Sequence, residues 1–310
     1  MTLNESVPSV FNKLIKHQDF ESRVSAYIVI IMTIVIGIPG NLTIIFVLIR
    51  IKKNVFSHSM KRCFLLLAIF DLMAVTGIAF KYLIQFLPFL LFIKLKEGHW
   101  CHFRYAFGDT AYTGSGWCLV WVAYERFVAI YFPLAYRSIS NKHSTEKIIM
   151  IVCTLALAIG GSQISCRPDP DEINVYAHEG QIVKYFVCTL STYQSDVCSQ
   201  LQYIRPIFFG FLPPVIIMVI NCFIIFRLIL RKKPGSSKVD STQIMLMITP
   251  IVYAILYFPK SYQIIVGKNE STGISLLSYS NHCINIFLYV LSCPPIRKEM
   301  MQMLRMHAYV

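Results

Sequence analysis

Charged side chains are scarce in this chain of 310 residues. Asp, Glu, Lys and Arg make up 15% of the sequence, against roughly 25% in an ordinary soluble domain. Hydrophobic residues reach 55%, which leaves too little polar surface to keep a folded soluble domain dispersed. The composition therefore excludes a soluble enzyme of ordinary type and indicates a protein whose surroundings are largely lipid.

The few charges stand in short clusters between long apolar runs. Seven runs have about 18 or more residues, which is enough for a helix to cross a hydrocarbon layer of roughly 30 Å. Short segments of alternating polar and apolar residues, typical of membrane barrels, are absent. We expect an all-α membrane protein that folds as a seven-transmembrane helix bundle. The runs are residues 24–49, 63–93, 105–124, 148–165, 206–226, 241–259 and 271–296.

Basic residues concentrate in alternate loops of this expected bundle. Residues 50–62, 137–147, 227–240 and 297–310 hold 16 Lys/Arg against 3 Asp/Glu, and the other loops show no such excess. By the positive-inside rule these loops face the cytoplasm, so the N-terminus lies outside and the plasma membrane is the expected location. The net charge of +13 then belongs to the inner leaflet, and no nucleic-acid partner is expected.

The sequence divides into three expected parts. Residues 1–23 form an extracellular tail without a cleaved leader, residues 24–293 form the membrane domain, and residues 294–310 form an amphipathic helix and cytoplasmic tail. Two glycosylation sequons, at Asn4 and Asn269, fall outside in this orientation.

Polar residues inside the runs are functional hypotheses, because an ionisable group at the bilayer centre costs roughly 2.5–3.5 kcal/mol. Asn281, Asn285 and Tyr289 follow one another at intervals of four residues and share one helical face. Ser115 and Arg126 share a face of the third run. These faces indicate a hydrated interior, with simple helix–helix hydrogen bonding as the alternative. The ionisable residues among these hypotheses are Asp71, Lys81 and Asp109, inside the runs, and Glu125, Arg126 and Lys260, directly after the third and sixth runs.

Five motifs occur in an order that resembles the rhodopsin-like (class A) G-protein-coupled receptors. They are Pro39-Gly40-Asn41, Leu67-Ala68-Ile69-Phe70-Asp71, Glu125-Arg126-Phe127 with its Arg126 25 residues after Cys101, Phe132-Pro133-Leu134-Ala135-Tyr136, and Asn285-Ile286-Phe287-Leu288-Tyr289. The amino-acid sequences of the sixth and seventh runs are most similar to those of invertebrate neuropeptide receptors, of FMRFamide type and including flatworm receptors. The resemblance implies an extracellular ligand, a neuropeptide, and activation of a heterotrimeric G protein through the inner ends of helices 3, 5 and 6.

The resemblance also implies two sets of signalling residues. In the family, a contact at the cytoplasmic end of the third helix locks the resting state: an arginine lies beside a carboxylate at rest and meets the G protein after activation. The residues of this inner lock correspond to Glu125, Arg126, Phe127 and Tyr289. Its activation switch corresponds to Tyr257, Pro259 and Asn285. The chain departs from the family pattern because Tyr257 stands where a Trp is usual and Ile286 stands where a Pro is usual.

The resemblance also implies a sodium site and a disulfide bond. Positions that line an allosteric Na⁺ site correspond to Asp71, Ser115, Asn281 and Asn285, whose oxygen atoms suit a hard cation. The alternative is a water-filled hydrogen-bond network, and no other cofactor is expected. A disulfide between Cys101 and Cys188 is expected in the oxidising outer compartment, while a second bridge between Cys166 and Cys198 is left open.

The ligand site is constrained mainly by exclusion. Gly108 stands where amine receptors carry an Asp, and Tyr279 stands where opsins carry a Lys. The remaining outer-half residues offer both signs of charge and aromatic surface, which suits a peptide terminus or a small acidic ligand. They are Lys81, Tyr82, Gln85, Arg104, Asp109, Arg205, Lys260 and Tyr279. Pairing of Asp109 with Lys260 or Lys81 is the structural alternative.

Three other functions are alternatives to a peptide receptor. A receptor for a lipid or a chemosensory ligand fits the same motifs. A seven-span transporter is disfavoured because paired repeats and broken-helix sites are absent from the sequence. An enzyme is not expected, because His282 alone among the eight His lies inside a run and no catalytic set shares one depth.

Overall fold

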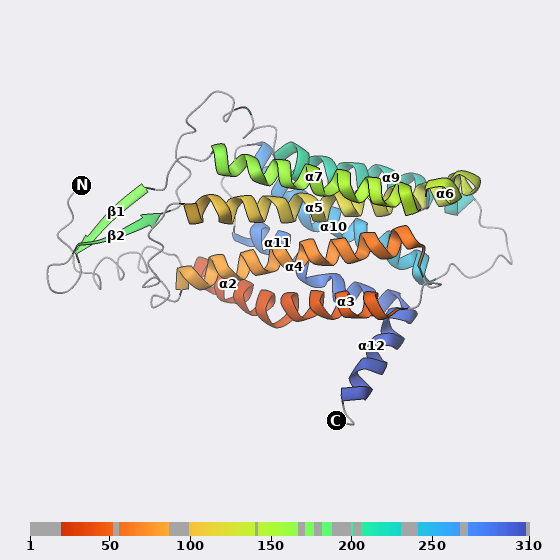
Figure 1. The fold of residues 1–310 in the computed structure, drawn as a ribbon, viewed down its shortest axis with the longest axis horizontal. Helices are drawn as coiled ribbons and strands as arrows, with labels where there is room; N and C mark the ends of the chain where they lie inside the picture. The colour runs from red at the N-terminus through yellow and green to blue at the C-terminus, as the bar shows by residue number, and fades with distance from the viewer. Residues whose placement is uncertain are drawn as a thin grey trace.

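Seven helical crossings build the fold of this computed structural model (Figure 1). The structure describes residues 20–51, 56–86, 99–139, 142–166, 171–176, 182–187, 200, 206–230, 241–266 and 272–307. In chain order the crossings are α2 (Phe20–Ile31) with η1 (Met32–Gly37) and α3 (Ile38–Arg50), α4 (His58–Phe86), α5 (His99–Tyr131), α7 (Lys142–Cys166), η3 (Pro206–Phe211) with α9 (Leu212–Leu230), α10 (Ser241–Ile265) and α11 (Thr272–Ser292). Each expected run therefore corresponds to one crossing.

The remaining elements lie at the two ends of the bundle. A short helix, α6 (Pro133–Ile139), follows α5, and α12 (Pro294–His307) leaves the same end at a steep angle (Figure 1). At the opposite end, strands β1 (Asp171–Tyr176) and β2 (Ile182–Val187) pair antiparallel, with Asp171 opposite Val187. This hairpin is the exception to the all-α prediction.

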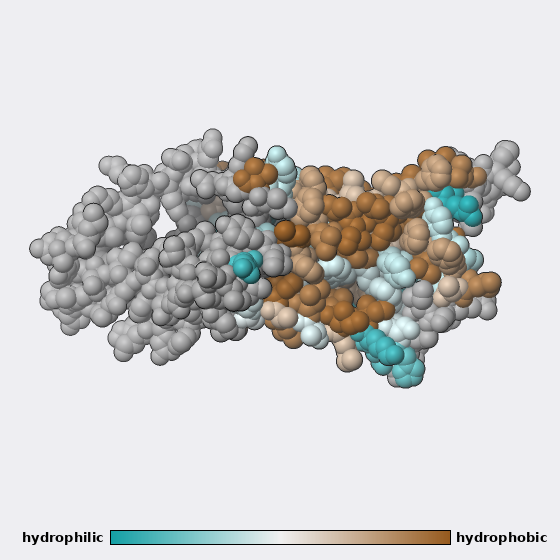
Figure 2. All heavy atoms as spheres, turned by 90° about the horizontal axis from the view of Figure 1, so that it is seen from above, coloured by the Kyte–Doolittle hydropathy of each residue, from teal (hydrophilic) through white to brown (hydrophobic). Residues whose placement is uncertain are grey.

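Among the residues that the structure describes, five of the crossings are long and apolar enough to span a membrane by length and composition alone. They are the crossings at Val24–Arg50, His58–Leu83, His143–Ser162, Pro206–Leu230 and Gly273–Leu291. Apolar residues gather over the middle of the bundle in Figure 2. Phe46, Ile151 and Phe226 are among the large hydrophobic side chains that the structure leaves exposed. Such a surface is suited to lipid and would be a liability in water.

The helix α5 is the central helix, because it packs against α4, α7, α9 and α10. These neighbours shield its charged and polar residues, and α5 is not among the five candidate spans. The helix α10 is likewise not among them, and it contains Pro250 and Pro259 in its interior.

The π-helical turns η1 and η3 each precede proline. Pro39 lies in the first turn of α3, and Pro213 and Pro214 lie in the first turn of α9. A proline ring clashes with the carbonyl four residues earlier and removes one N–H donor. That carbonyl lies within η1 or η3 in each case, and the wider π turn accommodates the ring.

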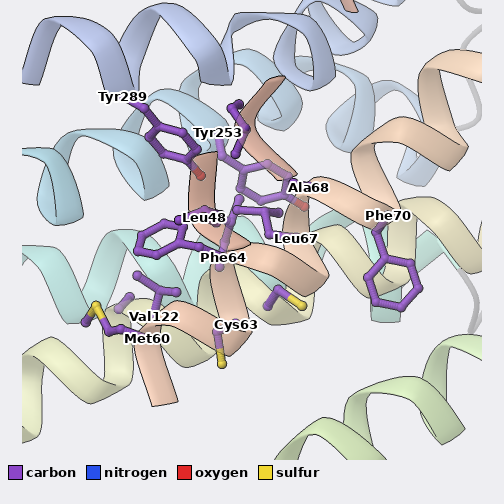
Figure 3. Packing of buried hydrophobic residues seen from close by; sticks show 14 of the residues in the cluster. Leu48, Met60, Cys63, Phe64, Leu67, Ala68, Phe70, Val122, Tyr253 and Tyr289 are labelled. Atoms are coloured by element: carbon purple, nitrogen blue, oxygen red, sulfur yellow. The ribbon is translucent and has the colours of Figure 1, made fainter. Parts of the chain in front are cut away.

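Figure 3 shows part of the larger core cluster of the described residues, which lies in the half of the bundle that the charge pattern predicts to face the cytoplasm, called the inner half below. Tyr289 of α11 packs edge-on against Phe64 of α4, with ring centroids 5.3 Å apart. Tyr253 and Tyr257 stack on one another along α10 at 5.4 Å. These aromatic side chains are almost completely buried, so they fix the spacing of α4, α10 and α11 around the polar residues above them.

Candidate functional site

A buried carboxylate, Asp71 of α4, is the centre of a polar network in the bundle. Its Oδ1 accepts a hydrogen bond from Ser115 Oγ of α5 at 2.7 Å, and its Oδ2 accepts one from Asn285 Nδ2 of α11 at 2.5 Å. His282 Nδ1, also on α11, lies 2.7 Å from Oδ1. An ionised carboxylate can only accept, so the imidazole donates in this contact. Asp71 thereby joins three helices through charge-assisted hydrogen bonds.

The predicted polar face of α11 is confirmed as an inward face. Asn281, Asn285 and Tyr289 are all buried. Asn41 of α3, part of the first motif, donates from Nδ2 to the main-chain oxygens of Gly37 and His282, both at 2.9 Å. The side chain of Asn41 therefore attaches the first crossing to the seventh beside the Asp71 network.

Tyr112 of α5 connects this network to the outer half of the bundle. Its ring centroid lies 5.2 Å from that of the His282 imidazole. Lys260 Nζ of α10 lies 5.7 Å from the centre of the same Tyr112 ring and 4.9 Å from that of Tyr279. Lys260 is only 8% exposed, so these cation–π contacts act largely away from water.

A second aromatic pair extends the outer cluster toward α4. Tyr82 meets Tyr279 edge-on at 6.2 Å, and Lys81 Nζ lies 5.1 Å from the centre of the Tyr82 ring. The structure thus brings four of the predicted ligand residues together: Lys81, Tyr82, Lys260 and Tyr279. The cluster combines positive charge with aromatic faces from α4, α10 and α11.

The other predicted outer residues are placed less closely. Arg104 lies over the ring of Tyr105 at 4.5 Å, and Asp109 is half-buried on α5. Gln85 lies on α4 and Cys101 on α5, but their side chains are outside the described part of the structure. The remaining predicted residues of the outer side, Arg205, Cys188, Cys198, Asn4 and Asn269, lie outside the described residues altogether.

At the inner end, Glu125 of α5 is completely buried. Its Oε1 accepts hydrogen bonds from Ser57 Oγ at 3.0 Å and from Tyr136 OH of α6 at 3.2 Å. Its neighbour Arg126 points Nη2 at Met60 Sδ of α4, 2.8 Å away. The Glu125 carboxylate therefore connects α5 to the start of α4 and to the short helix α6.

Aromatic packing surrounds the two other predicted inner residues. Phe127 stacks on Tyr131 at 4.6 Å, and Tyr131 OH donates to the main-chain oxygen of Phe223 in α9 at 2.8 Å. Tyr289 packs on Phe64, and its hydroxyl has no hydrogen-bond partner within the described residues. This hydroxyl is therefore available for a partner in another conformation.

Two of the three predicted switch residues, Tyr257 and Pro259, lie on α10, and the third, Asn285, lies on α11 in the Asp71 network. Pro259 lies in the interior of α10 and leaves the main-chain oxygen of Ile255, four residues earlier, without its usual donor. Ser261 Oγ donates to the main-chain oxygen of Gly210 in η3 and also lies 3.1 Å from the Tyr257 main-chain oxygen. A hydroxyl two residues after the proline thus holds α10 against the fifth crossing.

The sequence alone missed several participants. His282 contacts Asp71 directly, Tyr112 connects Lys260 to His282, and Ser57 and Tyr136 bind Glu125. A signal existed for His282, because it is the one His inside an apolar run. No feature of the sequence indicated that Ser57 or Tyr136 would contact Glu125, from which they are 68 and 11 residues away along the chain.

Comparison with known families decides the class of the protein. The family model described as 7 transmembrane receptor (rhodopsin family) matches residues 40–293. The chain belongs to this rhodopsin receptor family. The match confirms the predicted seven-transmembrane bundle, and because the family consists of receptors, it also confirms that the chain is not an enzyme.

One curated relative is an opsin. The ultraviolet-sensitive opsin of Melopsittacus undulatus is 29% identical over 102 residues, which cover 26% of this receptor and 28% of the opsin. The receptor therefore spans less than a third of that relative's length in the match. Tyr279 of α11 stands where opsins carry a Lys, and the ammonium group beside its ring belongs to Lys260 of α10.

Proposed function

We propose that this receptor binds an extracellular neuropeptide and activates a heterotrimeric G protein from the plasma membrane. The observation that carries the proposal is the unbroken series of contacts from Lys260 through Tyr112 and His282 to Asp71. A ligand that touched Lys260 and Tyr112 would change the packing of His282. Membership of the receptor family supports an extracellular ligand and a G-protein partner.

The outer cluster favours a ligand that presents a carboxylate or polarised carbonyl groups. Lys260 and Lys81 supply positive charge, and the rings of Tyr82, Tyr112 and Tyr279 supply flat apolar surface. A peptide terminus or an acidic side chain offers both complementary features. A small acidic molecule is the second candidate for the same reason.

At the inner end, Arg126 is the residue proposed to meet the G protein. In this structure it lies against Met60, and Glu125 is held by Ser57 and Tyr136. These contacts support a resting arrangement, because the Glu125 carboxylate and the Arg126 guanidinium both bind residues of this receptor at the start of α4. Outward movement of α10, hinged at Pro259, would open the inner end of α5, against which α10 packs, to the G protein.

The proposal extends to the outer surface. We propose an extracellular N-terminus, a disulfide between Cys101 and Cys188, and glycans on Asn4 and Asn269. The basic inner loops and the position of the hairpin at the end opposite α12 support this orientation. Treatment of intact cells with a glycosidase and Asn4→Gln and Asn269→Gln variants would test it.

The ligand is tested with a promiscuous G-protein readout in cells that express the full chain. A neuropeptide library is applied in amidated and free-acid forms, together with small carboxylic acids. A Lys260→Met variant is compared with Lys147→Met, which removes an exposed lysine at the start of α7. We expect a saturable peptide response whose half-maximal concentration rises roughly 10- to 150-fold in Lys260→Met only, because a hydrogen bond to a charged group contributes about 1.5–3 kcal/mol.

Two results would overturn the ligand assignment. Equal potency in Lys260→Met and Lys147→Met would remove Lys260 from the ligand site. A response to small acids without any peptide response, at normal surface expression, would replace the neuropeptide by the second candidate.

A further inference from the structure

The surroundings of Asp71 do not fit the sodium site that the family resemblance implies. A hard cation needs oxygen ligands whose lone pairs point at the metal. The carboxylate of Asp71 would be the essential anionic ligand. Its two oxygens are instead the acceptors of three hydrogen bonds, from Ser115 Oγ, His282 Nδ1 and Asn285 Nδ2.

The donors face the carboxylate with hydrogen atoms. Asn285 presents its amide nitrogen to Oδ2, and Ser115 presents its hydroxyl hydrogen to Oδ1. A cation in front of the same oxygens would meet those hydrogens at close range. Asp71 and His282 are also almost completely buried, with side-chain exposures of 0% and 1%, so the pair is closed to solvent.

His282 occupies the place nearest the carboxylate and is held there from two sides. Its main-chain oxygen accepts the Asn41 amide at 2.9 Å, and the Tyr112 ring lies against the imidazole at 5.2 Å. The Asn41 bond fixes the backbone at this position, and the imidazole itself is packed between Tyr112 and Asp71. The obstruction does not depend on the charge of the imidazole, because Nδ1 carries a hydrogen toward the carboxylate in the donating neutral ring and in the protonated ring alike.

We infer that His282 replaces a metal ion as the partner of Asp71, so this receptor is insensitive to sodium at this site. In this geometry the His282 side chain alone causes the insensitivity to sodium. Replacing His282 by a small hydroxyl residue leaves Asp71, Ser115 and Asn285 in place and vacates the space beside Oδ1. The His282→Ser variant gains a sodium site that the natural chain lacks.

The test is the thermal unfolding of the purified full-length receptor in sodium chloride and in choline chloride at equal ionic strength. The natural chain is expected to unfold at the same temperature in both salts. His282→Ser is expected to unfold roughly 2–6 °C higher in sodium, with a saturable dependence on sodium concentration. Adding Asp71→Asn to that variant is expected to abolish the difference. No ligand or G protein takes part, so the result is independent of the proposed neuropeptide function.

His143→Ser provides the matched control, because it removes an exposed histidine at the inner end of α7 and is expected to gain no sodium response. If His282→Ser does not fold, His282→Asn takes its place. A sodium-dependent rise in the natural chain that Asp71→Asn removes would overturn the inference. A folded His282 variant that shows no sodium response would equally overturn it, since the imidazole would then not be what excludes the ion.

Discussion

The packing of α7 against α5 depends on the absence of a side chain at Gly160. A Cβ atom built there would lie 1.9 Å from Thr110 Oγ1 and 2.5 Å from the main-chain oxygen of Ala106. The second contact is with backbone, so no rotamer change relieves it and the two helices must separate. Because α5 carries Asp109, Ser115 and Glu125, this contact positions the central polar residues of the bundle.

We expect Gly160→Ala to destabilise the receptor by about 1–3 kcal/mol, which is the usual cost of an extra methyl group in a tightly packed site. This cost corresponds to a melting temperature lower by roughly 2–12 °C for a protein of this size. Gly161→Ala is the matched control, since a Cβ at Gly161 meets nothing within 4 Å. It should leave the melting temperature unchanged or raise it slightly, because alanine favours helix more than glycine does.

A double variant separates the two clashes at Gly160. Thr110→Ala removes the Oγ1 atom but leaves the main-chain oxygen of Ala106, so it should restore only part of the stability of Gly160→Ala. Thermal unfolding of the purified receptor measures all four proteins. Equal melting temperatures for Gly160→Ala and Gly161→Ala would refute the reasoning.

Three further predictions concern the inner half of the bundle. Tyr136→Phe removes a donor to the buried Glu125 carboxylate; it should raise ligand-independent signalling and lower stability by roughly 1–3 kcal/mol, and unchanged basal signalling would argue against Glu125 as part of the resting lock. Tyr289→Phe should leave the melting temperature nearly unchanged, because its hydroxyl is unbonded within the described residues, but should weaken signalling at equal surface density; a fully active variant would contradict this. Arg62→Gln breaks the 3.2 Å ion pair between Arg62 and Glu146, whose side chains are 40% and 41% exposed, and should lower the free energy of unfolding by at most about 1 kcal/mol. A larger loss of stability in thermal unfolding would show that solvent screens the pair less than its exposure indicates.

The bundle and its inward faces were predictable because each depends on local sequence. Crossing number follows from the length of apolar runs, and the inward face of α11 follows from the four-residue spacing of Asn281, Asn285 and Tyr289. The pairing of Ser115 with Asp71 was also within reach, since both are polar groups at one depth that lipid would not tolerate.

The contacts that sequence did not predict depend on rotamers and on helix rotation. His282 follows directly after Asn281, and only the orientation of α11 places its ring between Tyr112 and Asp71. Tyr136 reaches Glu125 because α6 packs against the end of α5. The hairpin of β1 and β2 lies outside the membrane, where hydropathy carries little information about secondary structure.

Nucleotide exchange on purified heterotrimeric G proteins tests the central claim most directly. Membranes that contain this receptor are compared with membranes that contain Arg126→Ala at the same surface density, across a panel of G-protein classes and with an activating ligand from the library. The account predicts ligand-dependent exchange on at least one class that Arg126→Ala abolishes. Exchange of equal size in the variant would contradict it.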